Sequence, residues 1–150
     1  MPRFLVASLL AVGLLLGQPA AAGQQPIYSG TPGGLAVSGY DAVAYFTDGR
    51  PVDGSEAYRF EWQGAVWRFV SQANLDRFKA DPATYAPQFG GYCAWAVSRG
   101  YTASADPQAW RIVDGKLYLN YDLEVKKTWE EDVPGNIAKG EANWPTVLDK

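Results

Sequence analysis

Hydrophobic and polar residues alternate over short stretches of this 150-residue chain, and such alternation predicts β-strands. Residues 58–62 read Tyr-Arg-Phe-Glu-Trp, which places three aromatic rings on one side of a strand and two charged side chains on the other. Gln63-Gly64 supplies a tight turn, and the apolar stretch at 65–70 returns as a second strand. The pattern therefore predicts a β-hairpin.

A second hairpin is predicted near the middle of the C-terminal half. Asp114-Gly115 is a strong two-residue turn signal, and it separates apolar stretches at 110–113 and 116–120. The short apolar stretch 42–46, followed by polar turn residues at 47–50, predicts one further strand.

Helices are predicted between and after the hairpins. Ser71 stands where a helix N-cap belongs, before residues 72–81, and Pro82 ends that helix. Further helices are expected at 92–99, 124–132 and 137–143, the second ended by Pro134-Gly135. No internal repeat and no linker is apparent. The predicted fold is α+β: one small domain in which antiparallel β-hairpins pack against short helices.

The first 22 residues have the pattern of a signal peptide. Arg3 gives a short positive region, residues 4–16 are apolar, and Ala20 to Ala22 supply a cleavage site. The apolar run is short for a membrane span and no second one follows, so no stable membrane insertion is expected after cleavage. We expect an exported, periplasmic or extracellular protein. Residues 23–34, rich in Gly, Pro and Gln, form an irregular lead-in to a domain at 35–150.

Charge argues against two classes of partner. The formal net charge is −3, and removal of Arg3 makes it one unit more negative. Nucleic acids and anionic membranes are bound by clustered Lys and Arg, and no such cluster is present. A small ligand or a partner protein remains the expected partner.

Cysteine and histidine usage limits the chemistry most strongly. Cys93 is the only cysteine, there is no histidine, and the single methionine is Met1. An internal disulfide and a Cys–His nucleophilic pair are therefore excluded. A metal site built within one chain from Cys and His is excluded for the same reason. The cofactor is unknown, and binding is expected rather than catalysis.

Three stretches carry a resemblance: GYDAVAYFTDGRPVDGS, the segment from YRFEWQGAVWRFVS to GGYCAWAVSRG, and WRIVDGKLYLNYD. Together they resemble the exported proteins with a YHS domain, from about Val37 to Trp144. The resemblance implies a YHS/TRASH-like core. GGYCAWAVS is similar to the exported subgroup in particular.

The resemblance also implies where a metal would bind in metal-handling members of that group. Their cysteines stand in a DPVCGM-like stretch and in an F-C-S-x-x-C turn. Here Ala44, Val70 and Asn74 stand at the three cysteine positions. The fold is therefore expected to be retained, with the thiolate site degenerate.

Cys93 admits three interpretations. Its neighbours Ala94, Ala96 and Val97 favour a buried small side chain, whose pKa burial would raise. A helix N-terminus near Cys93, helped by Arg99, would instead give a reactive thiolate. Cys93 from two chains would offer two thiolates to Cu⁺, as an intermolecular metal site.

The candidate ligand-binding residues surround this cysteine or lie in the aromatic N-terminal motif: Tyr92, Cys93, Trp95, Tyr40, Asp41 and Tyr45. Most of the chain's aromatic rings are expected in the core. The leading hypothesis is an exported YHS-like binding protein for a metal-related or small-molecule ligand. The alternatives are a thiol-based redox-responsive protein that uses Cys93 and a protein-interaction domain.

Overall fold

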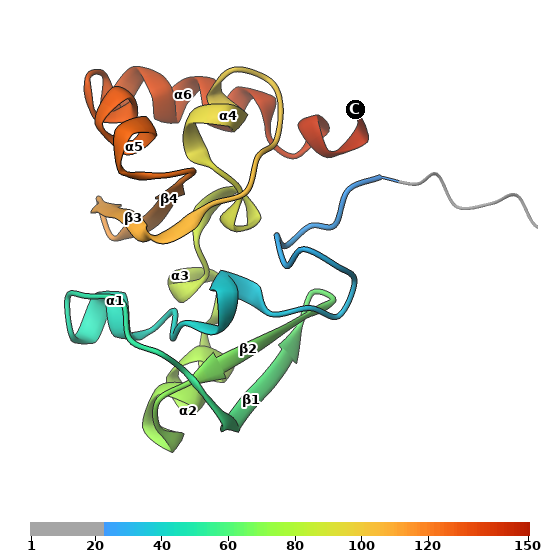
Figure 1. The fold of residues 1–150 in the computed structure, drawn as a ribbon, viewed down its shortest axis with the longest axis vertical. Coiled ribbons are helices and arrows are strands. Elements are labelled where there is room, and N and C mark those ends of the chain that lie inside the picture. The colour runs from blue at the N-terminus through green and yellow to red at the C-terminus, as the bar shows by residue number, and fades with distance from the viewer. Residues whose placement is uncertain (1–22) are drawn as a thin grey trace, which may run out of the picture.

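One order of elements occurs twice within residues 23–150, which the computed structural model describes (Figure 1). The first unit contains, in order, η1 (Ala36–Gly39), α1 (Ala44–Thr47), β1 (Ser55–Trp62), β2 (Ala65–Phe69), α2 (Gln72–Ala80) and α3 (Pro82–Tyr85). The second unit contains η2 (Gln88–Gly91), α4 (Ala94–Ser98), β3 (Asp106–Val113), β4 (Lys116–Asn120), α5 (Leu123–Glu130) and α6 (Val133–Asn143), before a last turn, η3 (Thr146–Asp149). The signal peptide expected at 1–22 lies outside the described residues.

The two hairpins have the same length, register and irregularity. In the first, Ser55 pairs with Phe69, and the register shifts before the continuous pairing begins at Arg59 and Arg68. In the second, Asp106 pairs with Asn120 and the shift falls at the corresponding place. Each residue of the second hairpin lies 51 positions after its counterpart, as Asp106 does after Ser55.

Backbone angles repeat as well. Val37 in η1 has φ 51° and ψ 33°, and Phe89 in η2 has φ 57° and ψ 36°. Both are left-handed conformations that non-glycine residues seldom adopt. Ser71 and Asp122 cap α2 and α5 alike, each accepting a hydrogen bond from the backbone N–H three residues on. The expectation of no internal repeat is therefore wrong for the backbone, although few residues are identical between the units.

The predicted fold class is confirmed, since two antiparallel hairpins pack with short helices in one small domain. The strand expected at 42–46 is wrong, because α1 lies there. Asp41 Oδ1 accepts hydrogen bonds from the N–H groups of Val43 and Ala44, which turns the chain into a helix. The helix expected at 137–143 begins earlier than predicted, because α6 starts at Val133. Pro134 does not prevent this start, since proline suits the first turn of a helix.

The second hairpin joins two hydrophobic cores. Leu117 and Leu119 of β4 lie in the core of the first unit, with Trp67 and Phe78. Tyr118, between them, points to the other face and packs in the core of the second unit. Because successive side chains of a strand point to opposite faces, β4 is buried on both sides.

Residues 23–34 contain no helix and only irregular backbone, yet they connect the two units. Ile27 is buried in the first core. The N–H of Tyr28 donates to Gly90 O and that of Gly33 to Gly64 O, so the segment is bonded to both units. Within residues 23–150, no helix is long and apolar enough to span a membrane.

Candidate functional site

The six candidate ligand-binding residues fall into two groups at corresponding places of the two units. One group follows η1 and the other follows η2: Tyr40, Asp41 and Tyr45, and Tyr92, Cys93 and Trp95. Each group begins with a tyrosine in extended conformation, with ψ 151° at Tyr40 and 158° at Tyr92. The candidate residues thus mark one local structure that occurs twice.

Asp41 is fully buried and organises the first unit. Its Oδ1 accepts hydrogen bonds from the N–H groups of Val43 at 2.8 Å and Ala44 at 3.1 Å. Its Oδ2 accepts from the N–H of Val70 at 2.9 Å and from Nδ2 of Asn74 at 2.8 Å. Four donors satisfy both carboxylate oxygens, so Asp41 ties α1 to the end of β2 and to α2.

Tyr45 lies four residues after Asp41 and faces the second hairpin, whereas Tyr40 is partly buried against the core of the first unit. The buried Tyr45 hydroxyl donates to Pro107 O at 2.8 Å, and its ring packs edge-on against Trp110 at 5.3 Å between centroids. Burial raises the pKa of Tyr45, and the nearby Tyr40 and Asp106 raise it further. These contacts give Tyr45 a structural role between the units.

Cys93 has a 1% exposed side chain, in agreement with the packing interpretation of this thiol. Burial raises the pKa of Cys93, whereas the backbone N–H groups of Ala96, Tyr121 and Trp95 oppose that rise. The N–H of Tyr121 donates to Sγ at 3.3 Å. A dimeric thiolate site for Cu⁺ needs an exposed sulfur, and burial of Cys93 argues against it.

The two aromatic neighbours of Cys93 have partners of their own. The Tyr92 hydroxyl donates to Gln25 O at 2.8 Å, and the residue is buried. The half-buried Trp95 ring carries the Arg99 guanidinium 4.0 Å above its centroid. Arg99 also donates to Asn136 Oδ1 at 2.9 Å, so it is engaged with Trp95 and Asn136 rather than with the thiol.

A cavity of about 280 Å³ lies beside Cys93. Its other walls are aromatic or aliphatic side chains: Trp95, Ala96, Tyr101, Ala103, Tyr121 and Val125. Tyr101 is 51% exposed and Tyr121 is 53% exposed, so the rim of the cavity faces solvent while the sulfur is covered.

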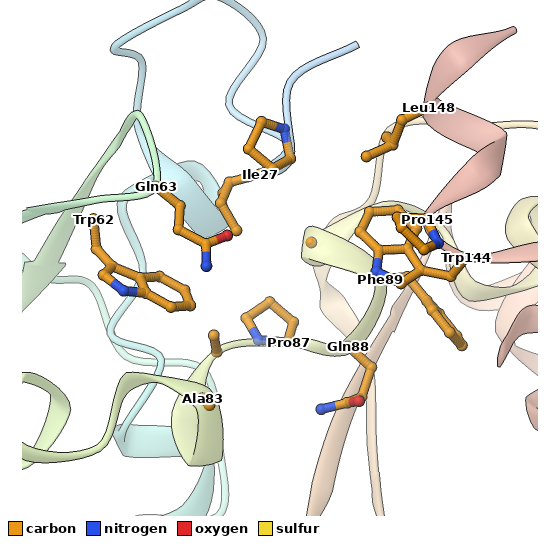
Figure 2. Close-up of a pocket in the computed structure, with 13 residues that line it drawn as sticks. Ile27, Trp62, Gln63, Ala83, Pro87, Gln88, Phe89, Trp144, Pro145 and Leu148 are labelled. Carbon is orange, nitrogen blue, oxygen red and sulfur yellow. The ribbon is translucent and has the colours of Figure 1, made fainter. Parts of the chain in front are cut away.

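A larger cleft of about 390 Å³ lies between the two units (Figure 2). Trp62 and Gln63, at the tip of the first hairpin, form one side, and Trp144, Pro145 and Leu148 form the opposite side (Figure 2). Pro87 lies between these walls, on the segment that joins the units, and the Phe89 ring packs beside Trp144 (Figure 2). Four chain segments far apart in sequence therefore build the cleft.

Among residues 23–150, none with an ionisable side chain lines this cleft. Its polar side chains are the amides of Gln63 and Gln88, and in Figure 2 the Gln63 amide points into the space between the two walls. The sequence marked Trp62 only as one of many aromatic residues and gave no reason to single out Trp144. Residues brought together from distant segments have no spacing that a sequence pattern reveals.

Residues 23–150 hold no group of three or more His, Cys, Asp or Glu side chains arranged to bind a metal ion. Residues 43–89, most of the first unit, match the YHS domain family. This segment is a YHS domain. No curated protein and no solved structure matches the chain. The match ends at 89, so the resemblance that runs on to Trp144 stays a prediction for the second unit.

The three positions that hold cysteines in metal-handling relatives come together in this YHS domain. Ala44, Val70 and Asn74 all donate hydrogen bonds to the Asp41 carboxylate, the first two from the backbone. The three positions at which the resemblance implies thiolate ligands are thus engaged with the Asp41 carboxylate. YHS domains are associated with metal-related binding, but these four residues satisfy one another.

Proposed function

We propose that this protein is a non-catalytic binding protein that holds an uncharged small molecule in the cleft between its two units. The observation that carries the proposal is the cleft itself, of about 390 Å³, with Trp62 and Trp144 on opposite sides and with no ionisable side chain among the described residues that line it. Small-molecule sites are concave and mostly apolar, with a few polar groups that set orientation. The amides of Gln63 and Gln88 supply such groups.

Charge selects the class of ligand. A charged group in this cleft would lose hydration without gaining an oppositely charged partner, and this loss costs several kcal/mol. A neutral molecule with an aromatic or aliphatic body gains from contact with the indole rings. The expected signal peptide adds that the ligand is met in the periplasm or outside the cell.

A protein-interaction domain is the second candidate. Tyr101, Tyr121 and Leu123 are more than half exposed, and apolar side chains exposed near one another mark interaction surfaces. Metal handling is less well supported, because the three inherited ligand positions are engaged with Asp41.

Fluorescence of N-phenyl-1-naphthylamine, an uncharged aromatic probe, tests the cleft. We expect a saturable rise in probe fluorescence with the unmodified protein. Ala83→Arg places a long charged side chain at the exposed edge of the cleft and should abolish that rise. Ala80→Arg, on an exposed helical position that does not line the cleft, is the matched control. No rise, or an equal rise in both variants, would overturn the proposal.

A further inference from the structure

Cys93 occupies in the second unit the place that Asp41 occupies in the first. Both residues follow the tyrosine that ends a left-handed turn. The N–H of Asp41 donates to Val52 O at 2.8 Å, and that of Cys93 donates to Ala103 O at 3.0 Å; Cys93 lies 52 positions after Asp41, and Ala103 lies 51 positions after Val52. Two side chains of different chemistry are therefore held by the same backbone.

The backbone donors around Asp41 are also present around Cys93. Tyr121 is the counterpart of Val70, and its N–H donates to Cys93 Sγ as that of Val70 donates to Asp41 Oδ2. The N–H groups of Trp95 and Ala96, counterparts of Val43 and Ala44, are close enough to lower the pKa of the Cys93 thiol, and that of Trp95 donates to Asn120 Oδ1. In the first unit these three donors bind a carboxylate, so this arrangement, here called the N–H cradle, suits an anion with two oxygens.

A buried side-chain donor beside the second N–H cradle has no acceptor. Asn120 is 1% exposed, and the Cys93 thiol donates a hydrogen bond to its Oδ1, with 3.7 Å between Sγ and Oδ1. Its Oδ1 also accepts from the N–H of Trp95 at 3.0 Å. Its Nδ2 is buried without a hydrogen-bond partner in the part of the chain that the structure describes. A buried donor without an acceptor is costly, so an acceptor placed beside Asn120 Nδ2 would be favoured.

Space for two oxygen atoms is available at the same point. Asn74, which donates to Asp41 in the first unit, corresponds to Val125 in the second, and Val125 lines the 280 Å³ cavity beside Cys93. The cavity rim at Tyr101 and Tyr121 is exposed, so a molecule as small as a peroxide can approach.

We propose that Cys93 is a site of oxidation by a peroxide and that its sulfinate is the form that the N–H cradle fits. In the first step the sulfur attacks one peroxide oxygen, the O–O bond breaks and water leaves, which gives the sulfenic acid. A second peroxide adds the second oxygen in the same way and releases water and a proton, which gives the sulfinate. Each step oxidises sulfur by two electrons and reduces one peroxide to water. The sulfinate then presents two oxygens on sulfur where Asp41 presents two on carbon.

This inference is independent of the cleft between the units. The reaction is a single modification rather than catalytic turnover, because the buried thiol has a raised pKa and no histidine is present to act as a base. Sulfinates are not reduced by ordinary thiols, so the modified protein persists.

Intact-mass measurement of the folded protein after hydrogen peroxide treatment tests the reaction. We expect Cys93 to gain two oxygen atoms and to stop there, with a Tm at or above that of the untreated protein. Cys93→Ala should gain none at this position. Absence of the two-oxygen product, progress to the three-oxygen sulfonate, or a lower Tm after oxidation would each overturn the proposal.

A substitution tests the N–H cradle without any oxidant. Cys93→Asp introduces the carboxylate that the first unit already holds, and we expect a Tm at or above that of Cys93→Ala. Val97→Asp, on the helix that Cys93 precedes and fully buried in an apolar core, is the matched control and should unfold the protein. If Cys93→Asp is destabilised as much as Val97→Asp, the N–H cradle does not accept an anion and the proposal is wrong.

Discussion

The side-chain amide of Asn74 donates a 2.8 Å hydrogen bond to the Asp41 carboxylate, whereas its counterpart Val125 faces a cavity beside Cys93. One structural position thus completes a polar network in the first unit and leaves space in the second. The two units share the same backbone conformation at this place, but the side chains that the backbone surrounds differ.

The first prediction concerns that hydrogen bond. Asn74→Val gives the first unit the type of residue found in the second, and it removes one of four donors from a buried carboxylate. Loss of a hydrogen bond to a charged group costs about 1.5–3 kcal/mol of unfolding free energy. Urea denaturation of the variant and of the unmodified protein measures this difference in unfolding free energy. Ala73→Val, at an exposed position of the same helix, is the control and should cost less than about 1 kcal/mol of unfolding free energy. Equal losses in the two variants would show that the Asn74 hydrogen bond makes no particular contribution.

A second prediction concerns the contact between α6 and the turn η2. A Cβ atom on Gly140 would lie 2.6 Å from Phe89 Cζ, in the core of the second unit. Replacement of a helical glycine by alanine usually gains about 1 kcal/mol, but overpacking of a core costs about 1–3 kcal/mol. We therefore expect Gly140→Ala to lower the unfolding free energy and the Tm. A gain in stability would show that Phe89 moves away freely.

A third prediction follows from buried tyrosines. Burial raises the pKa of Tyr45 above its ordinary value of 10.0. The neutral form is favoured in the folded state, so this contribution to stability is present below pH 10 and is lost as the pH rises above it. Once the unfolded tyrosine is ionised, each further pH unit costs about 1.4 kcal/mol.

Urea titrations on both sides of this pH provide the measurement. Tyr45→Phe removes the hydroxyl and its bond to Pro107 O, which should lower the unfolding free energy at neutral pH by about 1 kcal/mol. The same variant should lose less additional stability in alkali than the unmodified protein does. Parallel alkaline losses in the two proteins would contradict the assignment to Tyr45.

The fourth prediction concerns access to the thiol. Cys93 is covered and burial raises its pKa, so little thiolate is present at neutral pH. A bulky aromatic disulfide reagent should therefore react with Cys93 only after denaturation, and no disulfide-linked dimer should form in the folded protein. Rapid labelling of the native protein would restore the dimeric thiolate site as a hypothesis.

Local signals were enough to predict the two hairpins and the start of α2. Gln63-Gly64 and Asp114-Gly115 adopt left-handed conformations at the two hairpin turns, and Ser71 caps α2 as its position in the sequence predicts. The stretch 42–46 was misread because a short apolar run suits a strand and a buried helical turn equally. The hydrogen bonds of the Asp41 side chain favour the helix at this place, and the periodicity of hydrophobic residues carries no information about them.

The duplication and the cleft were beyond the reach of sequence patterns for different reasons. Phe78 and Trp129 fill corresponding core positions with different side chains, so a repeat preserved in the backbone leaves few identical letters. The cleft depends on Trp62 and Trp144 meeting across the two units, and only the tertiary fold brings them together. Cys93 stood out because it is the only cysteine, but its correspondence to Asp41 appears only when the backbones are compared.

The sharing of β4 sets a limit on how this chain can be divided. Leu117 and Leu119 lie beyond residue 89, where the YHS match ends, yet they belong to the same core as Trp67. A fragment cut at the end of the match would expose that core to water and is expected to aggregate rather than fold. The YHS segment of this protein is thus not expected to fold without the second unit. A chimaera in which a homologous domain replaces one unit must also supply the side chains that β4 contributes to the core of the first unit.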